Sequence, residues 1–319
     1  MTPCTVGFDT SNYTTSVAVA TLDGRVAANL KAPLPVKEGQ RGLRQSDALF
    51  EHTRNLPALT EELKLLLARE ELCPVATGVS ATPRDAEGSY MPCFLAGVAA
   101  AHSFSAALNV PLYKFSHQNG HIMAAAWSST EAERLLSAPF VAFHVSGGTT
   151  EALYVEPNET GIGVTTVGET DDINAGQLID RVGVMMGLSF PAGKEMERLA
   201  SEYNGKIYKH PVCVREGRCS LSGGENIAAR IYEREKDERA AAAFVFDFVC
   251  RTLIAMGEDM EGRYGKTPVL FAGGVMSNKL MRKRLSERFD AYFSEPEFSA
   301  DNAAGIALLC RKKYIEESK

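Results

Sequence analysis

The sequence lacks the cysteine pattern of a disulfide-stapled or zinc-ribbon protein. Its cysteines are odd in number, scattered along 319 residues and never arranged as C-x-x-C. This usage excludes a disulfide framework and predicts reduced thiols in a cytoplasmic protein. The cysteines are Cys4, Cys73, Cys93, Cys213, Cys219, Cys250 and Cys310.

Long apolar runs and an excess of positive charge are also missing. The longest apolar runs are broken within ~12 residues, whereas roughly 18 are needed to cross a bilayer. The first residues, MTPCTVGFDTSN, show no basic segment followed by an apolar one, so we predict neither a signal peptide nor a membrane partner. A net charge of −6 and a pI near 5.7 argue against an autonomous nucleic-acid clamp. A nucleic-acid substrate would require a local basic strip or a partner protein.

Several common catalytic signatures are absent. The chain contains neither a G-x-x-x-x-G-K-[ST] P-loop nor a G-x-G-x-x-G dinucleotide fingerprint. His117 and His121 have the spacing of a metal-binding helix, but Gln118 stands where a zinc peptidase carries its catalytic glutamate. A metallopeptidase is therefore a poor interpretation. By spacing alone, the two histidines are either metal ligands on one helix face or polar residues on a solvated turn.

A repeated supersecondary unit is present. Residues 5–33 read as strand, small polar loop, strand, Asp23-Gly24 turn and strand. Residues 139–170 repeat this plan around a Ser/Gly/Thr loop and a turn at Pro157-Asn158. Two copies predict an α/β protein with two duplicated lobes, each a mixed sheet flanked by helices. We place the first lobe at residues 1–138, including the helix with the two histidines, and the second at 139–319. A C-terminal helix from about residue 300 is expected to pack back on the first lobe.

Helical patterns fill much of the remaining chain. Apolar periodicity predicts helices near residues 59–72, 92–110 and 174–188, and one long helical region from about Asn226 to Glu261. A basic helix follows the strand TPVLFAGGV, and Asp301 and Asn302 are suited to cap the last helix.

Three loops place small residues at the end of a strand. They are Asp9-Thr10-Ser11, Ser146-Gly147-Gly148-Thr149 and Gly273-Gly274. Such loops expose several backbone N–H groups together and bind phosphate oxygens well, although each alone could be an ordinary tight turn. Together, with two at equivalent positions of the repeat, they resemble the phosphate and adenosine loops of the actin-like ATPase fold. Asp9 either holds a metal or water or merely terminates its strand.

Several motifs resemble, in order, those of the tRNA threonylcarbamoyladenosine transferases. They are VGFDTSNYTTSVAV, SHQNGH, VSGGTTEALY, the segment from Gly168 to Leu199, LSGGEN, LFAGGVMSN and SADNAAGIAL. The resemblance runs from about residue 5 to residue 310 and is most specific between Gly168 and Leu199. It implies an actin-like fold and transfer of a threonylcarbamoyl group from threonylcarbamoyl-AMP to the exocyclic amine of an adenine beside the tRNA anticodon. It also implies an adenine nucleotide as ligand and a small actin-like partner subunit.

The same resemblance implies roles for individual residues. His117, His121 and Asp301 would bind divalent iron or zinc, and Asp9 and Ser11 would serve catalysis. Asp180 would accept hydrogen bonds from the ribose hydroxyls, as carboxylates do in other nucleotide sites. Gly193 would contact the ribose and Asn278 the adenosine. Val145, Ser146, Gly147, Gly148 and Thr149 would bind the phosphate or carbonyl end of the substrate. Gly273 and Gly274 would contact its adenosine end.

His144 precedes this phosphate loop directly. Archaeal and eukaryotic members of the family carry at this position a tyrosine that approaches the metal. His144 is therefore either a fourth metal ligand or a half-buried strand histidine.

The chain departs from the family in its first loop. There, Tyr13 and Thr14 occupy the places of an Asp-Glu pair. Two later segments also differ from the family: ATPRDAEGSYMP replaces a Gly-Pro-Gly turn, and LSGGENIAAR lacks a lysine.

Because of these departures, two alternatives to the transferase stay open. One is a paralogue that moves a carbamoyl-type group to another acceptor, and the other is a non-catalytic nucleotide-binding assembly module. Retention of the three predicted metal ligands favours an enzyme.

Overall fold

The computed structural model describes residues 1–11, 13–35, 43–299 and 302–319. They form two compact units. The first contains residues 1–128, 156–164 and 297–319, and the second contains residues 129–155 and 165–296. Each unit has its own sheet and its own helices.

The first unit is built on a five-stranded sheet in the order β3-β2-β1-β4-β5. The antiparallel strands β1, β2 and β3 are followed by β4 and β5, which run parallel to β1. The predicted hairpin between β2 and β3 is confirmed, because Gly24 has a φ of +96° and its N–H donates to the carbonyl of Thr21. The strands are β1 (Thr2–Asp9), β2 (Thr14–Thr21), β3 (Val26–Pro33), β4 (Leu72–Thr82) and β5 (Leu112–Ser116).

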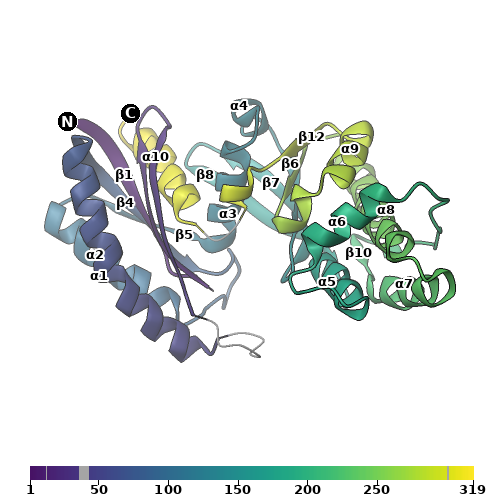
Figure 1. Cartoon of the computed structure of the whole chain (residues 1–319). Helices are drawn as coiled ribbons and strands as arrows, with labels where there is room; N and C mark the ends of the chain where they lie inside the picture. Colours follow the sequence, from purple (N-terminus) through teal and green to yellow (C-terminus); the bar gives the residue numbers. More distant parts are fainter. Residues whose placement is uncertain (12, 36–42, 300–301) are drawn as a thin grey trace. The chain divides into compact units, whose positions relative to one another are not determined.

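The alternation of side chains along β1 decides which helices cover each face of this sheet. Cys4, Val6 and Phe8 join the core formed with α1 (Gln45–Arg69) and α2 (Phe94–Leu108). Helix α10 (Ala304–Glu317) lies on the opposite face, as Figure 1 shows. Thr5 donates to the carbonyl of Ala307 at 2.8 Å, and α10 also packs against α3 (His117–Trp127). The C-terminal helix is thus a core element of the first unit.

The second unit repeats the same strand order. Its sheet runs β12-β11-β6-β7-β8-β10-β9, and the part β8-β7-β6-β11-β12 corresponds to β3-β2-β1-β4-β5. In both sheets a central strand pairs antiparallel with the next strand of the chain and parallel with a later one. The predicted duplication is confirmed. The strands are β6 (Phe140–Val145), β7 (Thr150–Asn158), β8 (Gly161–Thr170), β9 (Val214–Arg215), β10 (Arg218–Cys219), β11 (Val269–Ala272) and β12 (Ala291–Phe293).

The single helical region predicted from about Asn226 to Glu261 is wrong in one respect. The chain breaks after α7 at Lys236, which has a φ of +51°, and Asp237 then caps α8 by accepting the N–H of Arg239. No glycine or proline marks this break, so only the capping ability of Asp237 could have indicated it. The helices are α4 (Ala132–Leu135), α5 (Ala175–Met185), α6 (Gly193–Glu202), α7 (Ser222–Glu235), α8 (Glu238–Tyr264) and α9 (Lys279–Arg288), with short 3₁₀ turns η1 (Gly274–Ser277) and η2 (Pro296–Phe298).

Helix α8 has the length and composition of a membrane-spanning helix, and among the described residues no other helix does. Asp247 and Arg251 interrupt its apolar sequence, so α8 is apolar over a whole window and not in one unbroken run. However, 83% of its apolar window is buried inside the structure, where it packs against α5, α6, α7 and α9. Burial in the core of the second unit accounts for its apolar composition.

Candidate functional site

The loop between β6 and β7 is stabilised by hydrogen bonds among its own residues, and its glycines are exposed. The hydroxyl of Ser146 accepts hydrogen bonds from the N–H groups of Gly148 (3.2 Å) and Thr149 (3.0 Å), and the Ser146 N–H donates to the Thr149 carbonyl. Gly147 and Gly148 are exposed, and no neighbouring atom lies within 4 Å of the position a Cβ would take. The loop backbone is therefore fixed in shape and accessible to a ligand.

Three helices of the second unit begin at one cavity of about 410 Å³. Helix α5 contributes Gly176 from its first turn, α6 contributes its first residue Gly193, and α9 contributes its N-cap Asn278. The N-terminus of a helix is the positive end of the helix dipole, so three such ends at one cavity favour a negatively charged ligand. The cavity is lined by Gly147, Gly176, Ile179, Asp180, Pro191, Gly193, Lys194, Glu197, Phe246, Gly274, Val275, Ser277 and Asn278.

Two glycines allow the close approach that forms this cavity. The N–H of Gly176 donates to the carbonyl of Ser146 at 3.1 Å, and a Cβ on Gly176 would lie 2.7 Å from the Cα of Gly147. Gly273 has a φ of +99°, and a Cβ there would lie 2.3 Å from the carbonyl oxygen of Val145. Glycine is required at both positions because the opposing atoms belong to backbone that no side-chain rotation can move.

The structure brings the predicted nucleotide-binding residues together. Gly147, Asp180, Gly193, Gly274 and Asn278 all line the cavity. The remaining predicted positions belong to the two loops beside it. Val145 lies buried beneath the phosphate loop, Ser146, Gly148 and Thr149 belong to that loop, and Gly273 precedes Gly274. Residues separated by more than a hundred positions in sequence therefore share one surface.

Two carboxylates of the cavity wall are anchored to helix N-termini. Asp180 accepts the N–H of Ala192 at 2.8 Å, immediately before α6, and Glu197 accepts the N–H of Lys279 at 2.7 Å, the first residue of α9. Each contact uses one oxygen of the carboxylate. Within the described ranges the second oxygen of each has no hydrogen-bond donor, so it can accept a hydrogen bond from a ligand hydroxyl.

Asn278 supplies a polar group of the opposite kind. Its side-chain oxygen caps α9 by accepting the N–H of Met281 at 2.9 Å. Its side-chain nitrogen is buried and has no hydrogen-bond partner in the described part of the chain. Buried donors are nearly always paired, so this amide is a candidate to donate to a ligand.

Sequence reasoning missed Lys194, Glu197 and Phe246 in this cavity. Gly193 and Glu197 are four residues apart on α6 and therefore share a helix face. That spacing could have indicated Glu197 once Gly193 was singled out. Phe246 lies on the buried helix α8, where nothing distinguishes it from a core phenylalanine.

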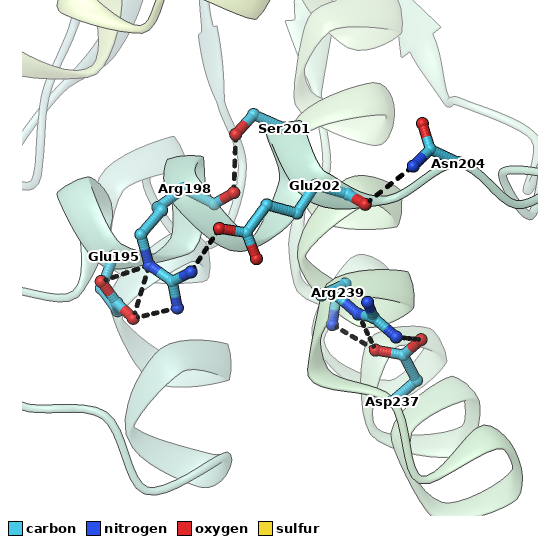
Figure 2. Close-up of polar contacts among 7 residues, drawn as sticks. All are labelled: Glu195, Arg198, Ser201, Glu202, Asn204, Asp237 and Arg239. Carbon is cyan, nitrogen blue, oxygen red and sulfur yellow. Dashed lines mark hydrogen bonds and ion pairs between the residues drawn. The ribbon is translucent and has the colours of Figure 1, made fainter.

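The outer face of α6 is covered by ion pairs, as Figure 2 shows. Arg198 bonds Glu195 and Glu202, which lie three residues before it and four after it, and the Arg198 hydrogen bond lowers the pKa of Glu195. Nearby, Arg239 pairs with Asp237 at the start of α8. Exposed pairs of this kind stabilise a helix weakly. Helix α6 therefore separates a solvated, salt-bridged face from the face that lines the cavity.

Asp172 joins the segment before α5 to the start of α7. Its carboxylate accepts hydrogen bonds from the N–H groups of Ile173, Leu221 and Ser222 and from the hydroxyl of Ser222. Burial alone would raise the pKa of Asp172, but the hydrogen bonds, led by the Ser222 hydroxyl, outweigh it and lower the pKa below its usual value of 3.8. The ionised form is therefore the one that stabilises this junction.

Asp172→Asn is expected to reduce the free energy of unfolding by about 1 kcal/mol at pH 7, because an amide oxygen replaces a charged acceptor. Since the folded pKa is lowered, the contribution is present above the unfolded pKa of about 3.9 and is lost as the pH falls through the folded value. Urea unfolding of both proteins between pH 7 and pH 3.5 should show the gap narrowing. The neighbouring Asp171→Asn removes only a surface pair with Arg218 and serves as control. A gap that does not change with pH would contradict the role of the charge.

In the first unit, Asp9 uses both carboxylate oxygens at the end of β1. One accepts the N–H of Ser11 at 2.8 Å, and the other lies 2.7 Å from Nδ1 of His117. Asp9 is 1% exposed. A carboxylate at Nδ1 holds the proton on that nitrogen and leaves Nε2 to bind a metal, as in many metal-binding histidines. The hydroxyl of Ser11 is also buried, with no hydrogen-bond partner in the described ranges.

Helix α3 presents the two predicted histidine ligands together. It starts at His117 because the Ser116 hydroxyl accepts the N–H of Asn119 at 3.2 Å. The rings of His117 and His121 lie one turn apart with centroids 4.3 Å from each other. The predicted third ligand, Asp301, lies outside the described residues. Within the described residues, no group of three or more His, Cys, Asp or Glu side chains is placed to hold a metal. The two neighbouring imidazoles and the carboxylate behind His117 nevertheless fit one.

His144 lies in the second unit, opposite Glu151 on the neighbouring strand β7. Its Nδ1 is 3.7 Å from a carboxylate oxygen of Glu151, which is buried. The structure gives His144 a half-buried strand position, and its role as a metal ligand stays a prediction. Sequence reasoning did not single out Glu151, which is recognisable only once the pairing of β6 and β7 is known.

The departures from the family also have definite places. Thr14 begins β2, and Tyr13 is 45% exposed, with its carbonyl accepting the N–H of Leu34. In the altered turn after β4, Asp85 accepts a hydrogen bond from the side-chain amide of Asn119 at 2.6 Å. This turn therefore braces helix α3, which carries the two histidines.

Comparisons with known proteins agree with this geometry. The tRNA N6-adenosine threonylcarbamoyltransferase of Streptococcus agalactiae is 30% identical over 95% of this chain and 90% of its own length. The protein of the same name from Methanopyrus kandleri is 28% identical over 95% of this chain and 85% of its own length. The structure of full-length HypF in its phosphate- and nucleotide-bound form matches with a TM-score of 0.61 at 12% identity, over 99% of this chain and 55% of HypF.

The structural match confirms the predicted actin-like fold class. Residues 79–308 also match the family model for TsaD, described as tRNA N6-adenosine threonylcarbamoyltransferase, which spans well over half of the chain. The chain therefore belongs to the tRNA N6-adenosine threonylcarbamoyltransferase family of transferases.

Proposed function

We propose that this protein transfers a threonylcarbamoyl group from threonylcarbamoyl-AMP to the exocyclic amine of an adenine beside a tRNA anticodon. The main support is the cavity of the second unit, where the residues that resemble the family's nucleotide site converge on three helix N-termini. The activity named for the relatives supplies the substrate class. A tRNA substrate also suits the chemistry, because an anticodon-loop base is easily unstacked.

The cavity suits the adenylate half of this substrate. The ribose hydroxyls would donate to the remaining oxygen of Asp180, and the phosphate would lie against Gly147 and the start of α5. In the reaction, the amine nitrogen forms a bond to the carbamoyl carbon while the bond from that carbon to the phosphate oxygen breaks. AMP leaves with the electron pair, and the amine loses a proton. Because an exocyclic adenine amine is a poor nucleophile, stabilisation of the leaving phosphate is a large part of the catalytic task.

We further propose that His117, His121 and Asp301 hold a divalent iron or zinc ion. Such an ion polarises a carbonyl or phosphate oxygen when it is bound. Asp9 would keep His117 in the tautomer that binds, and Ser11 would present its unpaired hydroxyl to the substrate.

The acidic net charge supports a role for partners in tRNA binding. We propose a small actin-like subunit as that partner and the cytoplasm as the place of action, where reduced cysteines are stable.

A second candidate follows from Tyr13 and Thr14. With no acidic pair in the first loop, the same nucleotide site could serve a carbamoyl-type transfer to a different acceptor, or a non-catalytic assembly module. Under both alternatives, the protein binds the nucleotide but produces no threonylcarbamoyl-modified adenosine in tRNA.

The test is to incubate the protein with threonylcarbamoyl-AMP, tRNA and the small actin-like subunit, and to measure modified adenosine by mass spectrometry of nucleosides. Nucleotide affinity is measured in parallel for the wild type, Asp180→Asn and the surface control Asp171→Asn. We expect modified adenosine with the wild type and about tenfold weaker nucleotide binding for Asp180→Asn alone. Nucleotide binding without modification would favour another acceptor or the module. No nucleotide binding would overturn the proposal.

A further inference from the structure

We propose that Lys194 is a specificity-determining residue that binds the ribose of the nucleotide and selects ribonucleotides over deoxynucleotides. This inference rests on the proposed function, since it names a further contact in the same cavity. It assigns a role to a side chain that no motif indicated.

Lys194 lies beside the residues that would bind the ribose, and together with Asp180 and Glu197 it forms what we call the ribose wall of the cavity. It follows Gly193 at the start of α6 and precedes Glu197 by three residues, and all three line the cavity. Residues three apart on a helix are neighbours, with Cβ atoms about 5–6 Å apart. Asp180 belongs to the same wall because it accepts the N–H of Ala192, the residue before α6. The ribose wall thus contains two carboxylates and one ammonium group.

The hydrogen bonds that these three side chains already make show which of their atoms can still bind a ligand. Asp180 and Glu197 each have one oxygen fixed by a backbone N–H. Among the described residues, Lys194 makes no hydrogen bond or ion pair, although Glu197 lies one helical turn away. Of the described residues that line the cavity, Lys194 is the one with a positively charged side chain. The amide nitrogen of Asn278, buried at the α9 side of the same cavity, also has no partner. Lys194 and Asn278 both line this cavity, and the donor groups of both lack an acceptor among the described residues, so both can bind an acceptor-rich ligand.

A ribose diol matches this set of groups better than a phosphate does. Each ribose hydroxyl donates one hydrogen bond and accepts others. The carboxylates can only accept from the hydroxyls, so the hydroxyl oxygens need a donor, and Lys194 supplies one. The phosphate end would lie instead at Gly147 and Gly176, beside the positive end of the α5 helix dipole.

A solvated surface lysine is the competing explanation, because Lys194 is exposed. The two explanations differ in what they predict for a nucleotide without ribose hydroxyls. A lysine that only attracts the phosphates by its charge affects all nucleotides alike. A lysine bonded to the ribose affects only those that carry the hydroxyls.

The experiment is calorimetric titration of the full-length protein with ATP and with 2′,3′-dideoxyATP. The variants are Lys194→Met, Lys194→Arg and the control Lys283→Met, an exposed lysine on α9 outside the cavity. We expect Lys194→Met to weaken ATP binding about threefold to tenfold and to leave dideoxyATP binding within about twofold. Lys194→Arg should retain most of the discrimination, and Lys283→Met all of it.

Two results would overturn the inference while leaving the proposed function intact. One is an equal weakening of both nucleotides by Lys194→Met, which would show a general charge effect. The other is unchanged binding of both. If the wild type binds neither nucleotide, the proposed function fails together with the inference.

Discussion

Replacing Gly305 by alanine is expected to lower the free energy of unfolding by about 3 kcal/mol or more, at the upper end of the range for overpacked cores. Gly305 lies on α10, where it faces α3. A Cβ there would stand 1.8 Å from the carbonyl oxygen of Gly120 and 2.9 Å from the backbone nitrogen of Ala124. Both atoms belong to the α3 backbone, so no rotamer change can make room and the two helices would have to separate.

The same separation would reach the candidate metal ligands. Helix α3 carries His117 and His121, and a Cβ at Gly120 would itself press on Ile306 of α10. Gly305→Ala should therefore lower both stability in urea and metal affinity. Gly262→Ala is the matched control, because Gly262 lies in α8 with no atom within 4 Å of its Cβ position, and there alanine should be neutral or stabilising by up to about 1 kcal/mol. If Gly305→Ala proved as stable as the wild type, α3 and α10 could not be in contact as described.

The sequence predicts features that depend on neighbouring residues. The Asp23-Gly24 turn requires a positive φ that glycine adopts freely, and this requirement is visible in the dipeptide itself. The loop at Ser146 and the duplicated strand order follow in the same way from short segments with alternating patterns. The sequence alone therefore predicts the fold class.

Side-chain partners from distant segments were not accessible in the same way. Asp9 and His117 are 108 positions apart, and only the parallel arrangement of β1, β4 and β5 brings the end of β1 to the start of α3. Likewise, Glu151 faces His144 because β6 and β7 pair in one register out of several possible ones. From the sequence alone, Asp9 had two interpretations, and spacing could not separate them.

The residues of the nucleotide cavity are predictable from the sequence only in part. The resemblance to a family indicates Asp180, Gly193 and Asn278, whereas Lys194 and Glu197 belong to the site only because α6 lines the cavity. Lys194 and Glu197 are charged residues on a helix with a solvated face, where charge by itself does not indicate a ligand site. The direction of the α6 axis relative to the loop decides which charges face the ligand, and that direction is set by packing on α8.

Asp9→Asn is expected to weaken binding of the proposed metal about 10- to 100-fold, the range for losing the carboxylate behind a ligating histidine, and to reduce the proposed transfer activity at least in proportion. Among the described residues, the Asp9 carboxylate accepts from the Ser11 N–H and from Nδ1 of His117. An asparagine has one acceptor oxygen, so it can serve Ser11 only by turning its NH₂ group toward His117. The imidazole would then have to accept at Nδ1 and carry its proton on Nε2, the nitrogen needed for the metal.

Metal content after dialysis and competition with a chelator would measure this effect without relying on activity. Asp23→Asn is the matched control, since Asp23 is a carboxylate of the same unit that accepts from the Thr21 hydroxyl and the Arg25 N–H on the exposed β2–β3 turn, far in sequence from both histidines. Because Asn is the same size as Asp, Asp9→Asn should remain folded, so a loss of metal would report the tautomer of His117 and not a collapsed site. Full metal content and activity in Asp9→Asn would leave Asp9 as the residue that ends β1 and nothing more. Loss of metal in Asp9→Asn, with Asp23→Asn unchanged, would make Asp9 the residue that prepares His117 for its ligand.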